Sequence, residues 1–192
     1  MFTDAARFLV QTLFDLMACA FFMRFWMQWT RVPFRNAFAQ FILRVTDFAV
    51  RPVRRVVPGL FGLDWASLLL FFVAELLMVL ATHWIMGYPF ALVGSGAIPG
   101  FLLLALASAL RLGLYMIIGF VLIQAVLSWV TPFSPLAPVF YAMAQPILAP
   151  FQKFIPPVGG VDLTPLVALI VVQLILIAPV SALERLALGM IW

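Results

Sequence analysis

Six polar side chains interrupt long apolar stretches of the sequence, and these residues could do chemistry in a hydrophobic environment. Four are ionisable and two are amides: Asp15, Arg24, Glu75, Arg111, Gln124 and Gln173. A charged side chain at the centre of a bilayer costs at least about 2.5–3.5 kcal/mol, so such residues usually face the protein interior and pair with one another or mark an ion pathway. We expect structural neutralisation by pairing, with an ion pathway as the alternative.

No pattern typical of an enzyme accompanies them. The sequence has no nucleophile–base pair, metal-ligand cluster or glycine-rich phosphate loop. A single cysteine, Cys19, excludes a multi-cysteine metal site, and a single histidine, His83, excludes a pair of histidine ligands. We therefore expect a protein that is not an enzyme and holds no cofactor or metal. Cys19 is interpreted as a small apolar group and His83 as an interfacial residue rather than a haem ligand.

The composition places the whole chain in a membrane. Of its 192 residues, 66% are hydrophobic and 9% are charged, and the mean hydropathy is +1.19, whereas a soluble domain carries roughly 25% charged residues. The pI near 10 resembles a nucleic-acid signal, but it reflects a net charge of +4 concentrated in one loop. Membrane asymmetry explains this pattern better, and we expect no nucleic-acid partner.

Four segments are long and apolar enough to span a bilayer as helices. The first runs from about Arg7 to Trp29, the second from about Trp65 to Met86, and the fourth from about Pro165 to Leu186. The third ends near Trp129 and begins between Phe101 and Leu112. The sequence leaves open whether residues 101–110 extend this helix or dip into the membrane interface.

Basic residues predict the orientation of these spans. The first and third loops hold seven of them: Arg31, Arg35, Arg44, Arg51, Arg54, Arg55 and Lys153. The second loop holds none, and the terminal segments contribute Arg7 and Arg185. We therefore expect the first and third loops to lie in the cytoplasm and both termini to lie outside it.

Depth in the membrane then suggests partners for the four charges. At a rise of 1.5 Å per residue, Arg24 lies roughly 7.5 Å and Glu75 roughly 15 Å above the cytoplasmic end, within reach of a long guanidinium stem. Asp15 and Arg111 lie roughly 21 and 27 Å above it. The sequence thus predicts the pairs Arg24–Glu75 and Asp15–Arg111.

An internal repeat divides the chain. The pattern P-x-x-[RK]-x-x-P-x-x-x-G-x-D occurs twice at an offset of 98 residues. Its residues are Pro52, Arg54, Arg55, Pro58, Gly62 and Asp64 in the first copy, and Pro150, Lys153, Pro156, Gly160 and Asp162 in the second. Each copy lies between two spans, so we expect two parallel units of helix, motif loop and helix. In the second unit Gln124 replaces Arg24 and Gln173 replaces Glu75, which predicts a neutral version of the first ion pair.

The motif residues have structural interpretations. Each aspartate precedes a span, where its carboxylate can cap the first turn, and Pro165 suits a first helical turn. The glycines two residues earlier are expected to permit a tight turn, and the prolines to fix an extended segment. Arg54, Arg55 and Lys153 are interpreted as contacts to anionic headgroups, with docking of an acidic partner as the alternative.

A second amphipathic segment precedes each motif. Phe38, Phe41, Ile42, Val45, Phe48 and Ala49 recur at helical spacing, and Leu136, Val139, Phe140, Met143 and Ile147 repeat the stripe. Such stripes suit short helices in the headgroup plane, or helices packed as core on the spans.

Both copies resemble the YggT family of small bacterial membrane proteins, which has chloroplast relatives. The resemblance is carried by residues 128–129, 145–157 and 159–165 in the second copy and by residues 24–29 and 46–64 in the first. This chain has Gln152-Lys153 where the family usually has two basic residues. The resemblance implies roles in osmotic and ion homeostasis, in division or nucleoid organisation, and in chloroplasts in haem attachment to a cytochrome b.

The sequence and the resemblance together predict an all-α, four-span protein of the bacterial inner membrane, in one domain and with both termini in the periplasm. The first repeat covers residues 5–86, a periplasmic loop residues 87–100, and the second repeat residues 101–188. The leading functional hypothesis is a scaffold or assembly factor acting through the cytoplasmic loops on a membrane or cytoplasmic protein partner. The rival is a small channel or ion-handling protein, and the oligomeric state, including a homo-oligomer, stays open.

Overall fold

A computed structural model describes residues 2–59, 62–90, 94–131, 133–155 and 162–191. Four helical segments in it are long and apolar enough to cross a membrane, as the sequence predicts. They are α1 (Phe2–Trp29), α3 (Trp65–Ile85), α5 (Ile98–Val130), and a fourth that runs from Thr164 to Ile191. Residues 101–110 lie inside α5, so they extend the third span rather than forming a separate segment at the interface.

The fourth span contains a local change of helix type. It consists of α7 (Thr164–Ile175), a π-helical turn (Leu176–Val180) and α8 (Ser181–Ile191). Pro179 lies within the turn, where its ring and missing N–H disrupt the regular α-helical hydrogen bonds. The Ser181 hydroxyl donates to the Leu176 carbonyl at 3.0 Å and adds a side-chain hydrogen bond across this turn.

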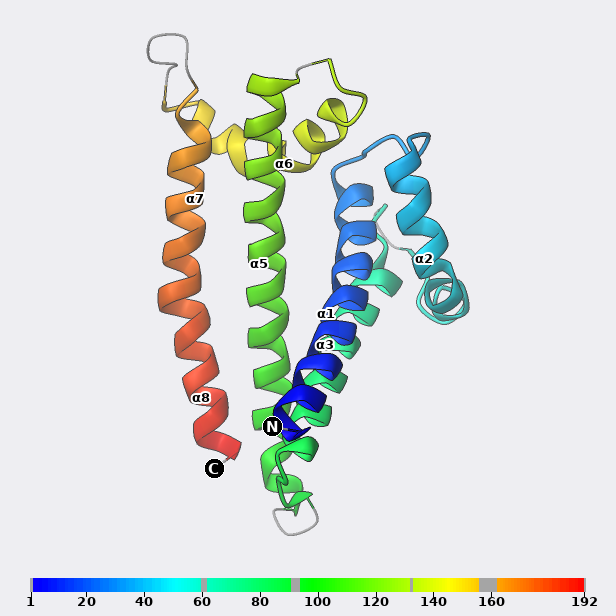
Figure 1. Ribbon diagram of the computed structural model, residues 1–192, viewed down its shortest axis with the longest axis vertical. Coiled ribbons are helices and arrows are strands. Elements are labelled where there is room, and N and C mark those ends of the chain that lie inside the picture. Colours follow the sequence, from blue (N-terminus) through cyan, green and yellow to red (C-terminus); the bar gives the residue numbers. More distant parts are fainter. Residues whose placement is uncertain (1, 60–61, 91–93, 132, 156–161, 192) are drawn as a thin grey trace.

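The spans form a bundle with two distinct ends (Figure 1). α1 begins and α8 ends at one end of the bundle, which also holds the short 3₁₀ helix η1 (Gly94–Ala97); we name it the terminal end. The other end, the motif end, carries the shorter helices α2 (Ala37–Val53) and α6 (Ala137–Gln152). α1 packs along α3, α5 lies next to both, and the fourth span forms the outer edge beside α5.

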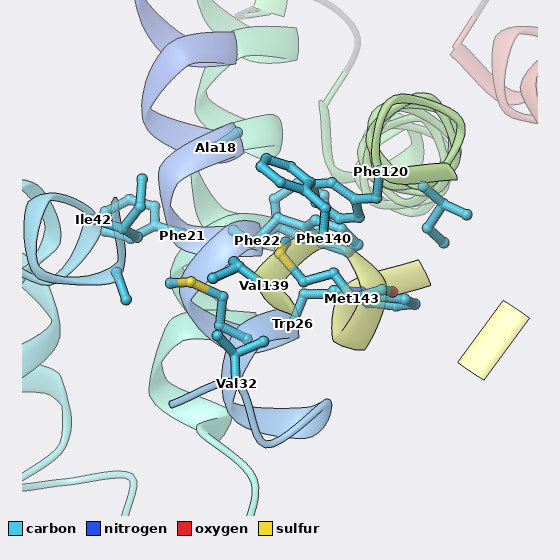
Figure 2. Close-up of a cluster of buried hydrophobic side chains, with 14 of the residues drawn as sticks. Ala18, Phe21, Phe22, Trp26, Val32, Ile42, Phe120, Val139, Phe140 and Met143 are labelled. Atoms are coloured by element: carbon cyan, nitrogen blue, oxygen red, sulfur yellow. The ribbon is translucent and has the colours of Figure 1, made fainter. Parts of the chain in front are cut away.

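The amphipathic stripes of α2 and α6 pack mainly as core. Ile42 of α2 and Val139, Phe140 and Met143 of α6 are buried in one cluster with residues of α1 and α5 (Figure 2). The core interpretation is therefore right for this face. α2 departs from it at Phe41 and Phe48, which are 60% and 68% exposed.

This cluster also joins the two repeats. The Trp26 indole N–H on α1 donates to the Met143 carbonyl on α6 at 2.9 Å. The rings of Phe38 on α2 and Phe140 on α6 pack at an interplanar angle of 43° with their centroids 5.7 Å apart. The motif end is thus one packed unit that fixes the polar residues described next.

Candidate functional site

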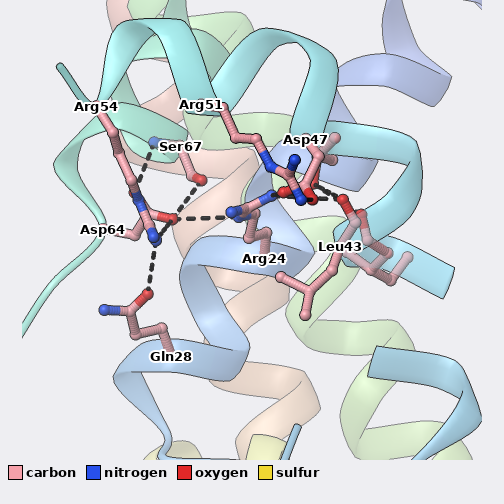
Figure 3. A network of polar contacts seen from close by, with 10 residues as sticks. Arg24, Gln28, Leu43, Asp47, Arg51, Arg54, Asp64 and Ser67 are labelled. Carbon is pink, nitrogen blue, oxygen red and sulfur yellow. Dashed lines mark hydrogen bonds and ion pairs between the residues drawn. The ribbon is translucent and has the colours of Figure 1, made fainter. Parts of the chain in front are cut away.

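A buried polar network at the motif end is centred on Arg24 (Figure 3). Its guanidinium Nη1 donates to Thr46 Oγ1 and to Asp47 Oδ1, each at 2.8 Å, and its Nε donates to Asp64 Oδ2 at 3.3 Å. The Thr46 hydroxyl in turn donates to the Ile42 carbonyl at 2.7 Å. One arginine therefore ties α1 to α2 and to the start of α3.

Asp64 caps α3, as its position before the span predicts. Its carboxylate accepts the Ser67 backbone N–H at 3.3 Å and the Ser67 hydroxyl at 2.7 Å. Arg54 Nη2 lies 2.5 Å from Asp64 Oδ2, and Arg54 Nε lies 3.2 Å from Oδ1. Burial raises the pKa of the Asp64 carboxyl, but the hydrogen bonds from Arg54 and Ser67 outweigh it and hold that pKa below its usual range.

A further contact closes the loop between Arg54 and Asp64. Gly62 has φ +77°, the left-handed conformation expected for a tight turn. The Gln28 amide donates to the Gly62 carbonyl at 3.0 Å, and Arg54 donates to Gln28 Oε1 at 3.3 Å. Arg54 therefore lies against its own chain, and its interpretation as a headgroup contact stays a prediction.

The predicted Arg24–Glu75 pair is wrong. Arg24 extends toward the motif end, where Asp47 and Asp64 supply two carboxylates close to its guanidinium. Depth along the spans does not include Asp47, which lies on α2, or Asp64, which precedes α3. The hydrogen bond from Arg24 holds the pKa of Asp47 below its usual range.

The second repeat carries a largely neutral copy of this network. At the same offset of 98, Gln145 replaces Asp47 and Gln152 replaces Arg54. Gln145 Nε2 donates to Gln152 Oε1 at 3.3 Å, and Gln152 Nε2 donates to Asp162 Oδ2 at 3.4 Å. The Asp162 carboxylate accepts the Thr164 backbone N–H at 2.8 Å, so it does cap the first turn, although Leu163 holds the position just before the helix.

The other predictions for the motif concern its prolines, its second glycine and its remaining basic residues. Pro52 and Pro150 lie inside the ends of α2 and α6, so the predicted extended segment is wrong for these two prolines. Pro58 does lie outside a helix. Pro156 and Gly160 lie outside the described residues. The exposed Arg55 and Lys153 form no ion pair within the part of the chain that the structure describes.

A second polar cluster lines a cavity of about 490 Å³ between the spans. Its polar lining residues are Arg7, Gln11, Asp15, Glu75, Thr82, His83, Ser108, Arg111, Tyr115 and Glu184. Glu75 lies midway along α3 and is 1% exposed, and its Oε1 has no hydrogen-bond partner among the described residues. The cavity thus combines a buried, incompletely bonded carboxylate with a polar wall.

The ion pair in this cavity joins Arg111 to Glu184 of α8. The predicted Asp15–Arg111 pair is therefore wrong, because α8 packs beside α5 and supplies a nearer carboxylate. Asp15 lines the same cavity without an ion pair to a described residue.

The single histidine and the single cysteine do not belong to a metal-ligand group among the described residues. The ring of His83 lies beside Phe101, with its Nδ1 2.8 Å from the Val79 carbonyl, and Cys19 is a half-buried free thiol. No group of three or more metal-ligating side chains occurs among the described residues. Gln173 is exposed on α7, so the predicted neutral contact between Gln124 and Gln173 is wrong.

Comparisons with known proteins agree with the repeat. The family model described as CCB3/YggT matches residues 3–85 and again residues 103–183. An uncharacterised protein encoded in the proC 3' region of Vibrio alginolyticus is 34% identical over 88% of this chain and 90% of its own length. An uncharacterised Pseudomonas aeruginosa protein is 35% identical over 89% and 86%, and YggT of Escherichia coli K12 is 28% identical over 90% and 87%. No solved structure matches the chain.

Proposed function

The chain belongs to the CCB3/YggT family, and from that premise we propose that it is a cation-handling membrane protein that binds and releases protons at Glu75. The observation that carries the proposal is the unpartnered Oε1 of this buried carboxylate, which lines the cavity between the spans. Ion handling is also one of the roles that the family resemblance implies.

The environment of Glu75 supports the binding of a proton or a cation there. A carboxylate removed from water is strongly disfavoured unless a proton, a cation or hydrogen-bond donors compensate it. Of the two arginines that line the cavity, Arg111 is engaged by Glu184, and Arg7 forms no ion pair with Glu75. Glu75 has therefore to be compensated by something that enters the cavity.

The cavity also offers a route. Its lining extends from Arg7 and Met86, near the terminal end, to Glu75 in the middle of α3. Asp15 lines the same cavity from α1. A proton is the ligand that fits best, because a single buried carboxylate can hold it, whereas metal ions in proteins usually require several oxygen ligands.

The test is proton flux in proteoliposomes loaded with a pH-sensitive dye. We expect the wild type to collapse an imposed pH gradient faster than empty vesicles, and Glu75→Gln to lose most of that difference. Asp162→Asn is the matched control, because it removes a carboxylate at the motif end, outside the cavity. Equal flux in wild type and Glu75→Gln would contradict the proposal.

A second candidate function, assembly of a partner, is supported by the outer surface of α2. The exposed Phe41 and Phe48 alternate with the exposed Arg44 and Arg51 at helical spacing. Because Arg54 binds Asp64 and Arg51 binds Asp47, we expect Arg44, between the two phenylalanines, to contact an acidic partner with apolar groups.

Site-specific photocrosslinking in cells can test this second candidate. A crosslinker at Phe48 should capture one defined protein, and Arg44→Glu should abolish the adduct unless the partner carries a compensating charge reversal. A crosslinker at the exposed Tyr141 of α6 is the matched control. Adducts of equal yield from both positions would argue against a specific surface on α2.

A further inference from the structure

One face of α7 is uncovered although its counterpart in the first repeat is buried. At the offset of 98 residues, Gln173 corresponds to Glu75 and Ile177 to Val79. Val79 is 3% exposed and packs in a cluster with Phe101 of α5, whereas Ile177 is 60% exposed. Gln173 is exposed as well.

The other inward-facing positions of the two segments are buried in both repeats. Ala74 and Val172 are both buried, as are Met78 and Leu176. The difference is therefore confined to the face that α5 covers on α3. α7 lies at the outer edge of the bundle, where the described chain provides no equivalent helix (Figure 1).

The uncovered face is a regular stripe with a polar centre. The stripe consists of Leu166, Ile170 and Gln173 of α7 and Ile177 of the π-helical turn that follows it, at intervals of four, three and four residues, and all four are exposed. This spacing is that of a left-handed helix–helix seam. Gln173 is the tenth residue of a 28-residue span, so its amide is placed within the apolar part of the bilayer.

An amide in that position requires a partner. Gln173 forms no hydrogen bond with any residue that the structure describes, and lipid tails offer neither donors nor acceptors. A glutamine amide both donates and accepts. Two glutamines on facing helices can therefore satisfy each other, and polar side chains of this kind hold membrane helices together.

We propose that two copies of this chain associate through the stripe on α7, with the two Gln173 amides hydrogen-bonded to each other. A second copy is the occupant that the stripe fits, because the amide is self-complementary and a two-fold arrangement closes without leaving a free stripe. With the two-fold axis along the membrane normal, both copies keep the same orientation. Because the inference is independent of the role of Glu75, either proposal can fail alone.

Cysteine crosslinking in native membranes tests the proposal. In a Cys19→Ser background, Ile170→Cys should give an oxidised band of twice the monomer mass. Leu77→Cys is the matched control, because Leu77 is exposed on the outer face of α3, and it should stay monomeric. Equal crosslinking from both positions, or an Ile170→Cys adduct of another mass, would overturn the proposed second copy.

The role of the amide needs a second measurement. Gln173→Leu should weaken dimerisation in a mild detergent roughly three- to thirty-fold, the range expected for hydrogen bonds between membrane helices, whereas Gln173→Asn should retain part of the affinity. Because Gln173 is exposed, neither variant disturbs the packing of the monomer. An unchanged dimer affinity in Gln173→Leu would overturn the assigned contact.

Discussion

Arg54 and Asp64, ten residues apart at the two ends of the first motif loop, form a two-point ion pair with oxygen–nitrogen distances of 2.5 and 3.2 Å. The same aspartate carboxylate also receives Arg24 and caps α3. Arg54 and the repeated aspartate of the motif therefore act together as an internal clamp on the first loop, and in the second copy Gln152 takes the place of the arginine.

Replacement of Arg54 should loosen this clamp. Arg54→Ala removes two charge-assisted hydrogen bonds from the buried carboxylate, and because the arginine is partly exposed we expect a loss of about 1–2 kcal/mol in the free energy of unfolding. Arg54→Gln should lose less, because Gln152 makes the corresponding contact to Asp162 in the second repeat. Thermal unfolding in detergent, followed by circular dichroism, measures both. Equal stability of wild type and Arg54→Ala would show that the contact contributes nothing.

Acid should weaken the same network. The pKa values of Asp47 and Asp64 are held below the ordinary value of 3.8. A carboxyl whose pKa is lower in the folded state contributes stability above its unfolded-state pKa and loses it as the pH falls through the folded-state pKa. We therefore expect the unfolding temperature to decrease as the pH falls below about 4. Asp64→Asn should show a shallower decrease, and an identical pH profile would contradict this assignment.

Arg24 should be the most sensitive residue of the network. Arg24→Gln removes the cation that Asp47 and Asp64 share. Because Arg51 and Arg54 still pair with these carboxylates, we expect a loss below the roughly 3–5 kcal/mol that is typical when one partner of a buried ion pair is removed. Adding Asp47→Gln reproduces the Gln124 and Gln145 side chains of the second repeat and should restore part of the loss. Glu75→Gln in place of Asp47→Gln should restore none of it, since Glu75 is outside the network. With the single variants Asp47→Gln and Glu75→Gln added, stability measurements on these proteins form two double-mutant cycles, of which the Glu75 cycle is the control.

The four spans, the repeat and the Asp64 cap could be predicted from the sequence because each depends on local signals. Length and hydropathy define a span, and a carboxylate before a span defines a cap. The partners of Arg24 and Arg111 could not be predicted in this way, since they depend on where α2 and α8 pack. A signal for the motif-end network was present in the matched replacement of Asp47 by Gln145 and Arg54 by Gln152. The repeated motif specifies neither position.

The orientation in the membrane remains a prediction from the sequence. Seven basic residues lie in the first and third loops and two in the terminal segments, and α1 begins at the same end of the bundle at which α8 ends. A periplasmic reporter fused after Trp192 should therefore be active, and a cytoplasmic reporter at the same place inactive. A fusion within residues 87–100 should behave like the C-terminal one. The opposite pattern at both sites would mean that the orientation is inverted.

α5 and α8 approach each other closely at Gly100, and a substitution there can be compared with one at Gly119. A Cβ atom added at Gly100 would lie 2.7 Å from Ile191 Cγ1 and 3.1 Å from the Ala187 carbonyl oxygen, so the two helices would have to separate. Gly119, on the same helix, has no atom within 4 Å of that position. We expect Gly100→Ala to destabilise the bundle by about 1–3 kcal/mol, as overpacking does. Gly119→Ala should be neutral or stabilise it by up to about 1 kcal/mol, because alanine favours a helix. If both variants unfold at the wild-type temperature, α5 and α8 do not approach each other as closely as described, and the Arg111–Glu184 pair that joins the same helices would have to be reconsidered with them.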